Sequence, residues 1–485
     1  MAPDADWRHE DGSVKMLKYL ISSNNISYRK YGLGEVDETL IYEIISGTKE
    51  ADRRGRVPGK FYLYDIVNNS RSGLDVDKLD YFQRDMQMTN VMVVSKASFD
   101  RFIFNAKVLP AQPLDNSVGH VSSDRLMFQS PRKRAANDDG SAVLDNFDTA
   151  RWPVMICYPE KQITEALELF RARFQMHSNV YTHKCVKQVE FMITDALKLA
   201  DPYIMIKGTV SDAFPTGLYR MSECIHDMEA FTKLKDSILD IIAYDHNPML
   251  EDAKMILDRI HKRKLYACLG KVLFKRGDDI FEMDENFIRR EIVNVSHDDD
   301  FGIEAFEGGG RDDSRMMFYS IEDSNTSFNN FLPLSQDTIS LSQTSLISNS
   351  GNNGHFGASE EFRKRKPLHD DDIIVEKMSI HYGLKSKNPV SRMRFYSKNA
   401  SKANLFGREI QETQYDAFLP RSFESLAVRV FCRSSDQHTI TSAHLAFRRW
   451  CKQKRAPSPL PSFSQHDNDI MNNSGLDSSM EEFAK

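Results

Sequence analysis

The sequence predicts a mainly α-helical protein with a small α+β lobe near its C-terminus and two low-complexity insertions. Three observations lead to this fold class. Apolar residues recur at three- and four-residue spacing before residue 109 and again after residue 150, which is typical of amphipathic helices. Segments after residue 371 are rich in β-branched residues and partly alternate, as strands do. Two stretches rich in Ser, Asn, Asp and Gly lack the apolar density to form a core.

The first part of the chain carries the first helices. Segments 14–23 (VKMLKYLISS) and 37–46 (DETLIYEIIS) each gather apolar residues on one helical face. FYLYDIVNN, at 61–69, leads into the polar stretch GLDVDKLDYFQRD at 73–85. A further amphipathic pattern, FDRFIFNAKVL, predicts a helix over 99–109.

More helices are predicted between the two insertions. The string ITEALELFRARFQMHSNVY predicts one long helix over 163–181. Two others are expected over 187–201 and 227–244, and a last helical pattern at 251–270 closes the set. In the C-terminal lobe, three strands and then one helix are expected, at 372–383, 392–398, 425–434 and 441–453.

The composition is that of an ordinary globular protein. Of the 485 residues, 40% are hydrophobic and 28% are charged, and the net charge is −6. This balance provides no global basic field for non-specific nucleic-acid binding, although it is compatible with a local basic patch. No apolar run reaches the length of about 18 residues that a membrane span needs. Six scattered cysteines without a CxxC pair predict free buried thiols, and the polar N-terminus predicts an intracellular protein.

One polar row lies in the segment 73–85. Asp77, Tyr81 and Asp85 recur at i, i+4 and i+8, with Lys78 beside them. This spacing places the three side chains on one side of a helix. Two interpretations remain open at this point, namely an acidic face in solvent or a polar face turned inward toward a metal or a phosphate.

A second row with the same spacing lies in the predicted helix over 163–181. Arg173, His177 and Tyr181 recur at i, i+4 and i+8. If both rows line one pocket, Arg and Lys side chains would hold phosphate oxygens, and Asp would hold a metal or a sugar hydroxyl. The alternative is two amphipathic helices whose polar faces lie in water.

Other motifs carry less information. His-Asp dipeptides begin at His226, His297, His369 and His466, and such a pair can converge on a divalent metal. The last three fall in segments that are expected to be disordered. The cluster SPRKR at 130–134 fits a proline-directed phosphorylation site, a nuclear-import signal or a solvated charge run.

Six strings of the sequence share one resemblance. They are WRHEDGSVKMLKYLISSNNI, FYLYDIVNNSRSGLDVDKLDYFQRD, VYTHKCVKQVEFMITDALKLAD, DMEAFTKLKD, KNPVSRMRFYSK and FRRWC. They resemble the SAM- and HD-domain deoxynucleoside triphosphate triphosphohydrolases. The resemblance implies a mostly helical HD-domain core and metal-dependent, dGTPase-type cleavage of a dNTP to deoxynucleoside and triphosphate. It also implies regulation by nucleotides that assemble a tetramer.

The composition of the segments and the resemblance together imply a division of the chain into parts. These are the C-terminal part of an HD catalytic domain (1–108), a disordered insertion (109–150), a helical continuation of the catalytic core (151–295), a disordered low-complexity insertion (296–371), an α+β regulatory and oligomerisation lobe (372–455) and a disordered tail (456–485).

The resemblance also implies roles for the first row. Asp77 matches the aspartate that binds the metal of the HD site. Lys78 and Tyr81 match groups that hold the triphosphate, and Asp85 matches a carboxylate that contacts the sugar. His9, in RHED, matches a histidine close to the scissile phosphate and is a candidate general acid.

In the second row, Arg173 matches a phosphate-binding arginine, and His177 and Tyr181 match positions that border the substrate. Tyr181 is expected to lie against the deoxyribose. The resemblance also implies contacts with allosteric nucleotides, which fall on Arg101, Lys161, His183, Lys184, Arg263 and Lys387.

The implied cofactor is a divalent metal (Zn, Fe, Mn or Mg), and the implied ligands are a dNTP substrate and dGTP, GTP or dNTP effectors. Further expectations are a homo-oligomer, single-stranded nucleic acid as an additional partner, no membrane, and a location in the nucleus or else the cytoplasm. In the family, the SAM domain, the first part of the HD domain and most metal ligands lie upstream of the RHED match. We therefore expect this chain alone to be a poor catalyst, or a non-catalytic nucleotide-binding or assembly module.

Overall fold

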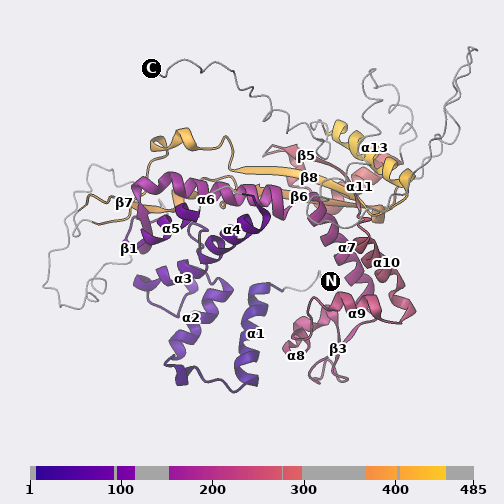
Figure 1. The fold of residues 1–485 in the computed structure, drawn as a ribbon, viewed down its shortest axis with the longest axis horizontal. Coiled ribbons are helices and arrows are strands. Elements are labelled where there is room, and N and C mark those ends of the chain that lie inside the picture. Colours follow the sequence, from indigo (N-terminus) through magenta and orange to yellow (C-terminus); the bar gives the residue numbers. More distant parts are fainter. Residues whose placement is uncertain are drawn as a thin grey trace, which may run out of the picture. The chain divides into compact units, whose positions relative to one another are not determined.

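The computed structural model of the protein describes residues 7–91, 96–114, 152–275, 277–297, 367–400 and 405–454. Over these residues the fold is mainly α-helical with small sheets (Figure 1), which confirms the predicted fold class. The chain forms two compact units. One is made of Met1–Leu265 and Ser379–Ser425, and the other of Tyr266–Met378 and Leu426–Lys485. The predicted C-terminal lobe is therefore shared between the two units.

Helices α1 (His9–Ser23) and α2 (Glu35–Ser46) begin the first unit, as the patterns at 14–23 and 37–46 predict. The two helices pack against each other. Helix α2 ends at Gly47, which has φ of +67°. Glycine adopts this left-handed conformation without the steric cost that a side chain brings, and so ends the helix.

A shared core joins the helices that carry the two polar rows. Short α3 (Tyr62–Val67) precedes α4 (Val76–Thr89), and α5 (Lys96–Phe104) and α4 both pack on α6 (Ile163–Met176) (Figure 1). Helix α4 buries Leu79, Phe82 and Met86, whose spacing of three and four residues makes one apolar stripe. The opposite side of α4 is left for polar residues.

The predicted helix over 99–109 is wrong at its end. The helix stops at Phe104, and β1 (Lys107–Pro110) follows. Strand β1 pairs antiparallel with β2 (Val154–Pro159), which pairs in parallel with β7 (Arg394–Tyr396). Partners distant in sequence thus override the local helical pattern. The predicted insertion begins inside this strand, since residues 109 and 110 belong to β1 and Ala111 forms a bridge with Gly407. Residues 115–150 of the predicted insertion lie outside the described residues.

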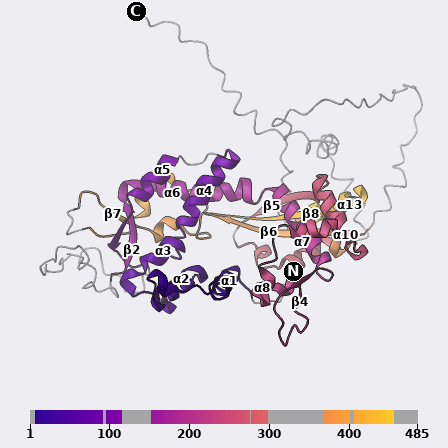
Figure 2. The same cartoon turned by 60° about the horizontal axis from the view of Figure 1, so that its bottom comes forward.

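The first unit also contains a helical pair. Helices α7 (Lys184–Ala200) and α10 (Glu251–His261) pack along each other (Figure 2), and β3 (Met205–Lys207) pairs with β4 (Leu218–Arg220). The single helix predicted over 227–244 is wrong. It is divided into α8 (Met228–Phe231) and α9 (Ile238–Tyr244). Asp236 and Ser237 lie at the break, and such side chains compete with helical backbone hydrogen bonds.

The second unit is built on a sheet of order β5-β8-β6, made by β5 (Ala267–Phe274), β8 (Glu424–Cys432) and β6 (Ile373–His381). The predicted helix at 251–270 therefore ends at His261, and its last part forms β5. Helices α11 (Glu285–Ser296) and α13 (Gln437–Gln453) share a core with this sheet. The boundaries between the two units fall inside β6 and β8.

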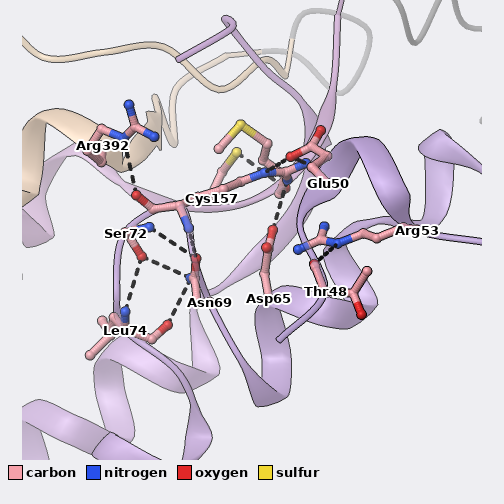
Figure 3. A network of polar contacts seen from close by, with 11 residues as sticks. Thr48, Glu50, Arg53, Asp65, Asn69, Ser72, Leu74, Cys157 and Arg392 are labelled. Atoms are coloured by element: carbon pink, nitrogen blue, oxygen red, sulfur yellow. Dashed lines mark hydrogen bonds and ion pairs between the residues drawn. The ribbon is translucent and has the colours of Figure 1, made fainter. Parts of the chain in front are cut away.

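A buried polar network fixes the turn that leads from α3 into α4 (Figure 3). Arg71 donates from Nη1 to Asp65 (2.8 Å) and from Nη2 to Glu50 (3.0 Å), and the Arg71 and Asp65 side chains are 7% and 3% exposed. The Nδ2 of Asn69 donates to the carbonyl oxygen of Leu74 at 2.9 Å. These contacts hold the residues just before α4 in one conformation.

Two further expectations concern the whole chain. All six cysteines are free. The sequence predicts free buried thiols, and four of them are buried, whereas Cys185 and Cys268 are partly exposed. None of the helices in the described ranges is long and apolar enough to span a membrane. The basic cluster at 130–134, residues 298–366 of the second predicted insertion, and the predicted tail at 456–485 lie outside those ranges.

Candidate functional site

The two polar rows meet in the first unit. Tyr181 donates its hydroxyl hydrogen to Asp85 Oδ2 at 2.7 Å. The rings of Tyr81 and Tyr181 lie edge to face, with centroids 6.1 Å apart. Both tyrosines are partly buried against the core that α4 and α6 share. The structure therefore brings the row of α4 and the row at the end of α6 together, so they do not form two separate solvent faces.

The end of the second row is not α-helical. His177–Tyr181 form a π-helical turn after α6, in which the Thr182 amide donates to the His177 carbonyl at 3.0 Å. The prediction of a continuous α-helix over 163–181 is thus wrong from His177 onward. The wider turn sets the His177 and Tyr181 rings 5.0 Å apart at 73°. Single π-turns inside helices occur often at functional sites.

Arg173 is a half-buried cation at this site. Its Nη1 donates to the carbonyl oxygen of His381, at the end of β6. In the part of the chain that the structure describes, no carboxylate pairs with it. Burial lowers the pKa of Arg173, but Tyr81 nearby opposes the shift, and a guanidinium stays protonated in proteins. A partly desolvated positive charge without a counterion favours binding of an anion.

His177 is expected to make folding sensitive to acid. Burial first, and then Arg173 and His381 nearby, lower the pKa of His177 from 6.5 to about 4. The unfolded chain therefore binds more protons than the folded chain between these values, so stability falls as the pH falls through this window. Discounted for the partial exposure of the ring, the loss between pH 7 and pH 4.5 is roughly 1–2 kcal/mol.

Urea unfolding at several pH values checks this expectation. The unfolding free energy of the wild type should fall more steeply with acid than that of His177→Gln, in which the titrating group is absent. The shift of His381 is present in both proteins and cancels in the comparison. Parallel pH profiles for the two proteins would contradict the buried, neutral state of His177.

One residue beside the first row, Asp75, was not predicted from the sequence. Asp75 is 5% exposed and caps α4, since its side chain accepts from the Lys78 amide. The Lys78 Nζ also donates to Asp75, at 2.8 Å, so this lysine is held at the start of the helix. The signal was available, because an aspartate directly before an amphipathic pattern is typical of a helix N-cap. Asp77 is exposed in the first helical turn, where the helix dipole favours a carboxylate.

Asp77 does not find a ligand set for the implied metal. Across the described residues, no three His, Cys, Asp or Glu side chains lie close enough to hold an ion together. A protein metal site normally has three or four such ligands. The residues present therefore do not fit a complete site, and none of the steps proposed below runs through a metal.

His9 lies away from both rows. Its side chain is 83% exposed, and its Nδ1 is 3.4 Å from a Glu10 carboxylate oxygen. The helix that begins at His9, α1, packs on α2 and α8. The structure therefore does not bring the predicted general acid to the residues of the two rows.

Two of the predicted effector residues are neighbours. Arg101, on α5, forms an ion pair with Glu165 of α6. Its carbonyl oxygen accepts from Gln162 Nε2 at 3.1 Å, and Lys161 directly precedes Gln162 in the turn before α6. Arg101 and Lys161 thus belong to adjoining segments where α5 meets α6.

The other four predicted effector residues belong to separate segments. His183 caps α7, accepting from the Cys185 amide, and Lys184 begins that helix. Arg263 follows α10 with a left-handed φ of +56°. Lys387 closes a tight turn, with its amide donating to the Leu384 carbonyl at 3.1 Å.

The structure gives the His226–Asp227 dipeptide a structural role. Asp227 Oδ2 accepts from the Ala230 amide (3.0 Å) and the Thr209 amide (2.9 Å), which caps α8 and ties it to the β3–β4 hairpin. Both residues also line an open pocket of about 480 Å³ beside that hairpin. We expect Asp227→Ala to lower the unfolding free energy by about 1–2 kcal/mol, because two amide donors lose their acceptor. Asp227→Asn should retain most of the stability in the same urea titration, and an equal loss in both variants would contradict the cap.

Comparison with known proteins supports the resemblance found in the sequence. No family model matches the chain. The chain is 28% identical to the mouse deoxynucleoside triphosphate triphosphohydrolase SAMHD1 over 94% of its own length and 56% of that protein. The cattle protein of the same name is 29% identical over 93% of this chain and 59% of that protein. The human protein is 27% identical over 94% of this chain and 57% of that protein. The chain thus spans less than two thirds of the length of these relatives. By sequence, it is a relative of the SAM- and HD-domain deoxynucleoside triphosphate triphosphohydrolase family.

Proposed function

We propose that the facing rows of α4 and the end of α6 bind a deoxynucleoside triphosphate, and that the protein acts as a dGTPase-type dNTP triphosphohydrolase. The observation that carries this proposal is Arg173, a half-buried cation without a carboxylate partner among the described residues, set opposite Tyr81. A triphosphate supplies the counterion that this arginine lacks. The similarity to proteins named dNTP triphosphohydrolases supports the choice of a deoxynucleotide.

Each row contributes a different part of the binding. Arg173 holds phosphate oxygens through its planar fork of donors, and Lys78 acts as a point charge that Asp75 keeps in place. These cations stabilise the negative charge that grows on the leaving triphosphate. His177 is neutral at pH 7, so it offers a hydrogen-bonding group without adding charge.

The tyrosines suit the sugar. Tyr181 is fixed by its hydrogen bond to Asp85 and by its contact with Tyr81. A ring held in this way presents a flat apolar surface, which packs against deoxyribose and leaves little room for a 2′-hydroxyl. The other carboxylate oxygen of Asp85, Oδ1, lies 3.8 Å from Arg84 Nε and accepts a hydrogen bond from a sugar hydroxyl.

A second candidate function is favoured by the position of His9. The predicted general acid is exposed and lies away from the rows. Under this alternative, the chain is a nucleotide-binding or assembly module that holds a dNTP without turnover. In either case, we propose that Arg101, Lys161, His183, Lys184, Arg263 and Lys387 contact effector nucleotides. Assembly of several copies of the chain, contact with single-stranded nucleic acid and a nuclear or cytoplasmic location complete the proposal.

The test uses the full chain with dGTP and a divalent metal, Mn²⁺ or Mg²⁺. Calorimetry measures dGTP binding, and chromatography measures release of triphosphate. Lys78→Ala should weaken binding about tenfold, since one charge-assisted contact to phosphate is lost. Lys198→Ala, on the exposed side of α7, is the control and should bind as the wild type does.

The outcomes separate the two candidates. Triphosphate release that disappears in Asp77→Ala supports the hydrolase. Binding without release supports the module. Absence of dGTP binding, or equal weakening in Lys78→Ala and Lys198→Ala, contradicts both.

A further inference from the structure

The segment that follows β6 lies against the residues of α6 that surround Arg173. Tyr382 is buried and stacks on Phe174, with ring centroids 4.9 Å apart and planes at 28°. It also meets Phe423 edge to face at 5.5 Å. The residue before Tyr382 is His381, whose carbonyl oxygen accepts from Arg173 Nη1. Aromatic packing on α6 thus places the acceptor that holds the guanidinium.

Gly383 gives this segment its backbone conformation. Its φ is +137°, in the region that L-residues with a side chain rarely adopt. A Cβ on Gly383 would lie 3.4 Å from the Phe170 ring, so the segment passes directly over α6. The Gly383 amide donates to His381 Nδ1 at 3.0 Å, which orients the imidazole. The backbone conformation of one glycine therefore determines how the neighbouring histidine is held.

The imidazole faces Arg173 with its acceptor nitrogen. Arg173 Nη1 lies 3.5 Å from His381 Nδ1, and the Gly383 amide points at the same nitrogen. Because both neighbours are donors, Nδ1 carries no hydrogen, and the proton of the neutral ring is on Nε2. Adding a second proton would set an N–H against two donors and beside a cation. Both the carbonyl oxygen and the ring of His381 therefore present an acceptor to the arginine.

We infer that His381–Gly383 is a positioning element for the phosphate-binding Arg173, and that His381 is its positioning residue. This inference rests on the proposed function, since it concerns the same triphosphate. Two acceptors on one residue hold Nη1, which leaves Nη2 and Nε to meet the phosphate oxygens. A guanidinium fixed in advance loses less conformational freedom when the ligand binds. The segment acts on the charged end of the nucleotide, and the sugar and base are held by other residues.

The experiment compares two ligands on the full chain by calorimetry. The ligands are dGTP, which carries the triphosphate, and deoxyguanosine, which does not. His381→Leu removes the ring acceptor and is expected to weaken dGTP binding about five- to tenfold without changing deoxyguanosine binding. His381→Asn keeps an acceptor at the position of Nδ1 and should restore most of the dGTP affinity. Ser379→Ala, an exposed position two residues earlier on β6, is the matched control and should bind both ligands normally.

Gly383→Ala provides a second measurement. Because φ of +137° is unfavourable for alanine, the amide that orients His381 should move, and dGTP binding should weaken selectively. Equal loss of both ligands in His381→Leu, or no loss of dGTP binding, overturns the positioning role. If Arg173→Ala weakens dGTP binding while His381→Leu does not, only this inference fails. If Arg173→Ala also binds dGTP normally, the proposed function fails with it.

Discussion

Arg173→Ala is expected to weaken dGTP binding by about 10- to 100-fold, because a charge-assisted contact to phosphate contributes about 1.5–3 kcal/mol. The stability of the protein should change little. The side chain is half-buried and bonded to backbone and ring atoms of His381, without an ion pair to a carboxylate in the described residues. Removing the Arg173 side chain therefore leaves no buried carboxylate without an ion-pair partner among the described residues. Calorimetry measures the affinity, and urea unfolding shows whether the fold is retained.

A matched control separates a local effect from a general loss of charge. Arg220→Ala removes the same side chain from β4, where it pairs with Glu223 at 3.2 Å and is 49% exposed. This variant should bind dGTP with wild-type affinity. Retention of wild-type affinity in Arg173→Ala would show that the nucleotide does not bind between the two rows.

Arg71→Ala is expected to lower the unfolding free energy by about 3–5 kcal/mol, the range found when one partner of a buried ion pair is removed. Asp65, which is 3% exposed, would lose its 2.8 Å contact with Arg71 Nη1, and Glu50 would lose its contacts as well. Arg53, which favours the charged form of Asp65, offsets part of the loss. Urea unfolding at pH 7 measures the effect.

Two further variants test whether burial of the ion pair causes the expected loss of stability. Arg29→Ala removes an arginine that pairs with Glu35 at the similar distance of 2.9 Å, but both side chains are about four-fifths exposed (79% and 84%). Its cost should stay below about 1 kcal/mol, because solvent screens an exposed pair. The double variant Asp65→Leu/Arg71→Met should be more stable than Arg71→Ala, since no charge is left without its partner. Equal costs for Arg71→Ala and Arg29→Ala would show that burial of the pair is not what matters.

The spacing of apolar residues predicted those helices that are determined by interactions between residues close in sequence. The apolar stripe Leu79, Phe82 and Met86 marked α4, because its spacing follows directly from helix geometry. The prediction for the end of the helix over 99–109 was wrong because a distant segment, and not the local pattern, determines the structure there. Residues Lys107–Pro110 pair with Val154–Pro159, and no local signal announces a partner more than 40 positions away. The π-turn at His177 could not be predicted either, since one altered backbone hydrogen bond distinguishes it from an α-helix.

The two polar rows of the candidate site could be predicted from the sequence, but the contact that holds Arg173 in place could not. Equal spacing of polar residues in two segments suggested that they line one pocket, and the contact between Tyr181 and Asp85 shows that they meet. His381 lies 208 positions from Arg173 and contributes a carbonyl oxygen, an atom that every residue carries. The sequence around His381 therefore contains no sign of its contact with Arg173. Asp75 differs, because the rule for helix N-caps identifies it once the helix over 73–85 is accepted.

Each of the two units is made of two separate stretches of sequence, and this has a consequence for biosynthesis. The first unit needs Met1–Leu265 and also Ser379–Ser425, whereas the second needs the stretch between them and the end. Until a ribosome has passed residue 383, a nascent chain holds Arg173 without the histidine and the tyrosine that later cover that part of α6. Termination after α6 but before that codon would release a product in which the Phe174 ring lacks the Tyr382 ring that stacks on it. We expect such products to be recognised by chaperones and degraded.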